Sequence, residues 1–102
     1  MLNIKKTIDN TTAVFNLEGR LDTTTAPELE KELKSSLDSI TTLTLDMKAL
    51  DYISSAGLRV LLFVQKNMDK QGKMTIRNAN ETVMEIFEVT GFSDILNFEG
   101  DD

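Results

Sequence analysis

The sequence predicts an α/β domain in which helices pack against a single mixed β-sheet. Apolar residues recur with a period of two in some segments and of about 3.6 in others, and the two kinds of segment alternate after an initial pair of strands. Strands separated by helices pair in parallel through right-handed crossovers. The length of 102 residues suits one domain over residues 1–102, with a polar acidic tail at 99–102 that we expect to fray.

The first two strands are expected to form a hairpin. Leu2 and Ile4 alternate with polar neighbours, an Asp-Asn pair at 9–10 favours a turn, and residues 13–17 alternate clearly until Gly19. The alternation that predicts the first strand is weaker than the alternation that predicts the second.

An amphipathic helix and a third strand follow the hairpin. Apolar residues at helical spacing span residues 26–40, with Pro27 in the first turn and threonines at 23–25 as candidate caps. Strict alternation then predicts a strand at 42–47, after which polar residues including Asp51 favour a turn.

The next helix is predicted from Ser55 to about Gln71, and it is apolar on more than one face. Leu58 and Leu61 share one face of the helix, whereas Val60 and Phe63 lie on the other. Two interpretations stay open. Either the helix is sandwiched within the domain, or part of it is exposed and awaits a partner.

The chain closes with a strand, a helix and a short terminal element. Gly72 fits the end of the preceding helix, and residues 74–77 alternate as a strand. Asn78 or Asn80 suits the cap of a third helix, and a short last element covers residues 92–98.

Composition excludes several classes of function. The chain has no His and no Cys, so the common catalytic triads, zinc sites and disulfides have no residues to build them, and we expect no enzyme, metal or cofactor. Its 17 acidic residues against 11 basic ones argue against nucleic-acid binding. No apolar run is long enough to cross a membrane or to act as a signal peptide, so we expect a cytoplasmic protein.

Ser54 and Ser55 stand where a strand gives way to the apolar helix, at the carboxyl end of one of the parallel strands of the mixed sheet. Backbone N–H groups at a helix start favour a Ser cap and tolerate a phosphate, so Ser55 is either a cap or a site of phosphorylation. Asp22 is either a turn and cap residue or a group that helps to present a hydroxyl. Gly57 serves either close packing of the helix start against a neighbouring backbone or the approach of a partner or kinase to its own backbone.

Three motifs resemble those of the STAS family. They are Gly-Arg-Leu-Asp at residues 19–22, Asp-Tyr-Ile-Ser-Ser-Ala-Gly-Leu at 51–58, and Ile-Phe-Glu-Val-Thr-Gly-Phe at 86–92, in the family's order and spacing. The resemblance spans essentially the whole chain, and the single-domain anti-sigma factor antagonists are the best match. It implies a STAS-like mixed sheet and a role in bacterial partner switching.

In that family the unphosphorylated antagonist binds an anti-sigma factor that is also a serine kinase, and the sigma factor is released. The kinase then phosphorylates one serine, two residues before the motif glycine, and a phosphatase reverses the step. The resemblance therefore implies phosphorylation at Ser55. It also implies a partner-binding surface that comprises Asp22, Ser54, Ser55, Ala56, Gly57, Leu58 and Arg59.

This chain departs from the family's pattern at two positions beside the acceptor. Ser54 stands where the best-studied members have Asp, and Ala56 stands where Ser or Thr is frequent. STAS modules also serve in sensory, stress-signalling and transport complexes without phosphorylation. A scaffold of that kind is the alternative function.

Overall fold

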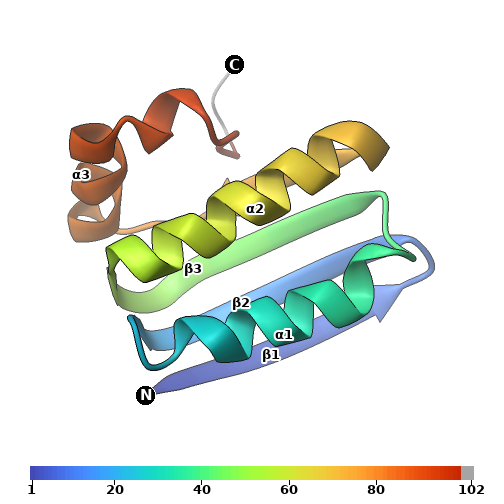
Figure 1. Cartoon of the computed structure of the whole chain (residues 1–102), viewed down its shortest axis with the longest axis horizontal. Helices are drawn as coiled ribbons and strands as arrows, with labels where there is room; N and C mark the ends of the chain where they lie inside the picture. The colour runs from blue at the N-terminus through green and yellow to red at the C-terminus, as the bar shows by residue number, and fades with distance from the viewer. Residues whose placement is uncertain (100–102) are drawn as a thin grey trace.

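The structure, a computed structural model, describes residues 1–99 and confirms the predicted α/β architecture (Figure 1). Strands and helices alternate after an initial hairpin. In chain order they are β1 (Leu2–Asp9), β2 (Thr12–Leu21), α1 (Ala26–Leu37), β3 (Thr42–Ile53), α2 (Ser55–Gln71), β4 (Lys73–Arg77), α3 (Glu81–Thr90) and a 3-10 turn at Phe92–Asp94.

The sheet has the strand order β1-β2-β3-β4. β1 and β2 are antiparallel and joined by a tight turn in which Asn10 takes a positive φ of 57°. β2 pairs with β3, and β3 with β4, in parallel. Leu21 and Ile53 are partners at the ends of β2 and β3, so the loops that follow these two strands begin side by side.

Helices α1 and α2 lie next to each other across one face of the sheet (Figure 1). Beneath them the strands contribute buried side chains in register, among them Phe15, Leu45 and Ile76. The apolar faces of α2 are mostly core, since Val60 is 6% exposed, whereas Phe63 is 39% exposed. The sandwiched interpretation therefore holds for most of the helix, and Phe63 is the exception.

β3 is longer than the sequence predicts. It runs to Ile53, past the expected end at Met47, because its parallel pairing with β2 continues and buries Leu50 and Ile53. Asp51 consequently lies inside the strand with its side chain exposed, and the predicted turn at this residue is wrong.

The helix boundaries follow the predicted signals closely. Asn80 caps α3, since its side-chain oxygen accepts a hydrogen bond from the N–H of Val83 at 2.8 Å. Asn78, the other candidate, has a positive φ of 61° and does not cap the helix. Gly72 stands at the end of α2 as predicted, and glycine is needed there because a Cβ would collide with the carbonyl of Thr41.

The two edges of the sheet differ. Outside β4, the segment 97–99 pairs with Ile76, whose N–H donates to the carbonyl of Asn97 at 2.8 Å and whose carbonyl accepts from the N–H of Glu99 at 2.9 Å. Fraying from residue 99 is thus wrong for Glu99, and residues 100–102 of the predicted tail lie outside the described residues. The opposite edge is β1, which carries Lys5 and Lys6.

Candidate functional site

Ser54 is the cap of α2. It follows β3 directly, and its N–H donates to the carbonyl of Leu21 at 2.8 Å. Its backbone is extended, with φ −97° and ψ 175°, and its hydroxyl accepts from the N–H of Gly57 at 3.4 Å. The interpretation of Ser55 as the cap is therefore wrong, because the residue before it occupies the capping position.

Ser55 is the first residue of α2, and it is exposed. Within residues 1–99 its hydroxyl makes no hydrogen bond. It lies beside the free N–H groups of the first helical turn, where the helix dipole favours negative charge. Of the two serine hydroxyls, that of Ser54 caps the helix, and that of Ser55 makes no contact that stabilises the fold.

Asp22 organises the loop between β2 and α1. One of its carboxylate oxygens accepts from the hydroxyl of Thr24 at 2.8 Å and from the N–H groups of Thr24 and Thr25 at 3.0 and 3.2 Å. The hydroxyl bond from Thr24 lowers the pKa of Asp22, partial burial opposes it, and the two N–H groups lower it further. The predicted turn role of Asp22 is confirmed.

The threonines do not cap α1 as predicted. Thr25 occupies the position before the helix, yet its hydroxyl donates to the carbonyl of Arg20 at 2.8 Å and accepts from the N–H of Asp22 at the same distance. The hydroxyl therefore ties the loop back to the end of β2, and the N–H of Glu28 donates to the backbone carbonyl of Thr25 instead of to its side chain.

Arg20 links the ends of β2 and β3 on the opposite side of the strands from the helices. Its guanidinium lies 4.5 Å from the ring centre of Tyr52, its partner in the sheet, and its Nε lies 3.8 Å from a carboxylate oxygen of Asp22. The sequence did not indicate this cluster. Both residues stand in the motifs, but they pair only through a parallel register that spacing does not reveal.

Gly57 allows α2 to pack closely on the strand ends. A Cβ here would lie 2.7 Å from Cγ of Leu21 and 2.9 Å from Cγ1 of Ile53, both of which are buried. The close-packing interpretation of Gly57 is confirmed, but the expected backbone neighbour is wrong, because the helix start packs against side chains of the strand ends. Leu58, the next residue, is only 6% exposed. Gly57 and Leu58 therefore belong to the packed underside of the helix start and not to its exposed surface.

A groove of about 490 Å³ runs between α1 and α2 beside the serines. Its α2 side is formed by residues three and four apart on one helix face, and its α1 side by the start of that helix. The lining residues are Thr23, Ala26, Pro27, Glu30, Ala56, Arg59, Val60 and Phe63. The sequence had pointed to Ala56 and Arg59, and the side-by-side placement of the helices adds the others.

Charges around the groove are unevenly paired. Lys34 Nζ lies 3.6 Å from a carboxylate oxygen of Glu30 and 5.0 Å from the ring centre of Phe63. Arg59 is exposed and has no carboxylate within 4.0 Å in the part of the chain that the structure describes. Of the two charged residues that line the groove, Glu30 is therefore paired and Arg59 is open to an incoming anion.

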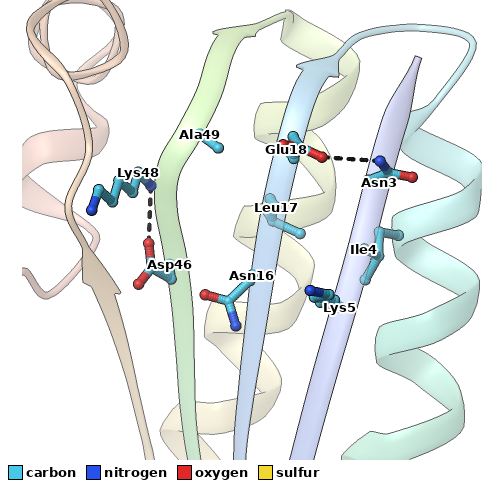
Figure 2. Close-up of a pocket in the computed structure, with 9 residues that line it drawn as sticks. All are labelled: Asn3, Ile4, Lys5, Asn16, Leu17, Glu18, Asp46, Lys48 and Ala49. Atoms are coloured by element: carbon cyan, nitrogen blue, oxygen red, sulfur yellow. Dashed lines mark hydrogen bonds between the residues drawn. The ribbon is translucent and has the colours of Figure 1, made fainter.

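A second depression of about 810 Å³ lies on the other face of the sheet. Figure 2 shows helices behind the strands and the polar side chains toward the viewer. Asn3 donates to Glu18 at 3.0 Å, and the N–H of Lys48 donates to Asp46 at 2.9 Å. These hydrogen bonds connect polar groups within the depression, and none of the motif serines reaches it.

Asp46 anchors this polar face. Arg77 lies 2.9 Å from one of its carboxylate oxygens, and Asn78 donates to the same oxygen at 3.2 Å. Burial raises the pKa of Asp46, but the N–H of Lys48 and the guanidinium of Arg77 outweigh it and hold the pKa below its usual value. These contacts give Asp46 a structural role in tying β3 to the end of β4.

Within residues 1–99, no cluster of three or more His, Cys, Asp or Glu side chains is arranged to hold a metal ion. None of the helices in that part of the chain is both long and apolar enough to cross a membrane.

The sequence matches the family model of the STAS domain over residues 3–101. The chain belongs to the STAS family. Among relatives, a protein of Bordetella bronchiseptica named "Putative anti-sigma factor antagonist BtrV" is 41% identical over 82 residues, which cover 78% of this chain and 71% of the relative. The anti-sigma-B factor antagonist of Bacillus subtilis is 30% identical over 83 residues, or 80% of this chain and 76% of the relative.

Solved structures of STAS proteins share the fold. An anti-sigma factor antagonist from Mycobacterium paratuberculosis has a TM-score of 0.88 at 20% identity, covering 99% of this chain and 87% of that one. The Bacillus protein SpoIIAA in its phosphorylated form has a TM-score of 0.74 at 16% identity, covering 99% and 93%. At these identities the likeness establishes the STAS architecture, within which the serine junction joins the central strand to α2.

Proposed function

We propose that this STAS protein is an anti-sigma factor antagonist of a bacterial partner-switching system. In its unphosphorylated form it binds an anti-sigma factor that is also a serine kinase, and the sigma factor is released. Phosphorylation of Ser55 ends the binding, and a phosphatase restores it. The chain carries no catalysis in this scheme and acts in the cytoplasm, where the sigma factor works.

One observation carries the proposal. Ser54 caps α2 through its hydroxyl, whereas the hydroxyl of Ser55 is exposed and makes no bond within the described residues. A kinase therefore meets a hydroxyl at Ser55 whose modification breaks no contact of the fold. The relatives named as anti-sigma factor antagonists support the same role.

A phosphate at Ser55 adds about −1.5 to −2 charges at neutral pH. The positive end of the helix dipole and the N–H groups of the first turn accommodate that charge, so the domain stays folded. A partner seated over the helix start instead meets a bulky anion that must be desolvated. Binding is lost while the fold persists.

The seven predicted interface residues divide into two roles in this proposal. Ser55, Ala56 and Arg59 form the contact surface at the start of α2. Asp22, Ser54, Gly57 and Leu58 hold that surface in place through the turn, the helix cap and the packing described above.

The presence of Ser54, where the family's best-studied antagonists have Asp, is compatible with this role. Asp and Ser are both strong cap residues, because each offers an oxygen to the N–H groups of the first turn. Ser54 thus preserves the helix start on which Ser55 is presented. The negative charge that Asp would add is absent from the surface offered to the kinase.

The test is phosphorylation by the serine-kinase anti-sigma factor of the same organism in the presence of ATP. Intact mass is expected to rise by one phosphate in the wild type and in Ser54→Ala, and to stay unchanged in Ser55→Ala. Phosphate added to Ser55→Ala would overturn the site.

The alternative is a scaffold of the same fold that phosphorylation does not regulate. Pull-down of the anti-sigma factor with Ser55→Asp distinguishes the two functions, with Ser55→Ala as the control that removes the hydroxyl without adding charge. The switch requires loss of binding in Ser55→Asp and retention in Ser55→Ala. Equal capture by both variants favours the scaffold.

A further inference from the structure

The groove between α1 and α2 has an apolar floor with a single unneutralised charge at the end nearest the serines. Ala26, Pro27 and Val60 contribute to the floor, and Phe63 is exposed beyond it. Glu30 is paired with Lys34, and Arg59 has no ion-pair partner within residues 1–99. A surface of this kind complements an apolar side chain that is flanked by a carboxylate.

Arg59 also stands in a fixed relation to Ser55. The two residues are four apart in α2, so their Cβ atoms are neighbours on the helix surface, about 5 to 6 Å apart. The long guanidinium side chain reaches an anion one turn toward the helix start. The same side chain can therefore face the groove or meet a phosphate on Ser55.

We infer that Arg59 forms an ion pair with a carboxylate of the partner, next to an apolar side chain of the partner that binds in the groove. When Ser55 is phosphorylated, its phosphate forms an ion pair with Arg59 in place of that carboxylate. This inference rests on the proposed function. The phosphate acts in two ways: it occupies the guanidinium that the partner needs, and it repels the carboxylate that the partner brings. Release then follows from a local exchange of one ion pair for another.

The intramolecular half of the inference is tested without a partner. Protein carrying phosphoserine at position 55 is titrated by ³¹P NMR, and the second pKa of the phosphate is measured in the otherwise wild-type chain, in Arg59→Gln and in Lys66→Gln. Lys66 is exposed on the same helix but three turns away, so Lys66→Gln makes the same change of charge at a distance.

Because an ion pair with Arg59 stabilises the dianion, Arg59→Gln is expected to raise that pKa by about 0.2 to 0.4 unit, and Lys66→Gln by less than about 0.1. Equal shifts in the two variants would show that the phosphate does not contact Arg59, and would overturn the inference.

The intermolecular half uses the purified anti-sigma factor kinase and five proteins: wild type and Arg59→Gln, each with Ser55 unmodified or phosphorylated, and unmodified Lys66→Gln as the control for the change of charge. Arg59→Gln is expected to weaken binding of the unmodified protein about tenfold, and Lys66→Gln less than twofold. Phosphorylation is expected to cost Arg59→Gln clearly less affinity than it costs the wild type, because the contact it disrupts is already gone.

The outcomes separate the inference from the proposed function. If phosphorylation weakens both proteins by the same factor, the switch stands and the part assigned to Arg59 is wrong. If phosphorylation leaves the affinity of the wild type unchanged, the proposed function itself fails, and the inference about the partner fails with it.

Discussion

Ser54→Ala should lower the stability of the domain and leave phosphorylation unchanged. Ser55→Ala should prevent phosphorylation and leave the stability almost unchanged. Ser54→Ala removes the oxygen that accepts from the N–H of Gly57. Loss of a Ser cap costs about 0.5 to 2 kcal/mol, and the distance of 3.4 Å places this bond in the weaker half of that range. We expect Ser54→Ala to lower the free energy of unfolding by about 0.5 to 1 kcal/mol.

Ser55→Ala should change stability little. The hydroxyl makes no hydrogen bond within residues 1–99, and alanine is the better helix former, so the free energy of unfolding should stay within about 0.5 kcal/mol of the wild type. Ser54→Asp serves as the matched control at the capping position. It keeps an acceptor oxygen and should recover most of the stability lost in Ser54→Ala.

Urea denaturation followed by circular dichroism measures these differences. A loss of 0.5 to 1 kcal/mol moves the midpoint by about 0.5 M at unchanged slope, and the melting temperature by about 4 °C. The reasoning is refuted if Ser54→Ala is as stable as the wild type while Ser55→Ala loses about 1 kcal/mol. That result would assign the cap to the second serine.

Two further predictions concern packing and pH. Gly57→Ala should lower the free energy of unfolding by about 1 kcal/mol in the same denaturation assay. The overpacking of the new Cβ against Leu21 and Ile53 outweighs the gain in helix propensity. A variant more stable than the wild type would show that these two side chains can move aside. Asp46→Asn should be less stable than the wild type at neutral pH. The folded pKa of Asp46 is lowered, so its contribution is complete above the unfolded value of 3.8 and is lost as the pH falls through the folded value. The gap between the two proteins should therefore close in acid, and a gap that stays constant would mean that Arg77 contributes through packing alone.

The fold was predictable where local signals and tertiary structure agree. Alternation in β2, the cap at Asn80 and the stop at Gly72 each express a constraint that lies within a few residues. The end of β3 was missed because its last residues are held by pairing with β2, and the polar composition around Asp51 resembles a turn. Where a strand is extended by pairing with a strand distant in sequence, the residues next to its end carry no pattern that predicts the extension.

The site was predictable in its position but only partly in its chemistry. A serine pair between a strand and an apolar helix locates the junction, and the turn role of Asp22 follows from residue type. Which serine caps the helix depends on the residue at which α2 begins, and two adjacent serines are equally good caps by residue type, so the sequence does not distinguish Ser54 from Ser55 in this role. The groove and the pairing of Arg20 with Tyr52 arise from contacts between segments far apart in sequence.

The unequal edges of the sheet have a consequence for crowded solutions. Since the segment 97–99 covers β4, β1 is the edge through which another chain can extend the sheet. Antiparallel pairing of two copies about the centre of β1 would set the lysines at 5 and 6 against those of the second copy. That repulsion disfavours edge-to-edge pairing of two copies through β1.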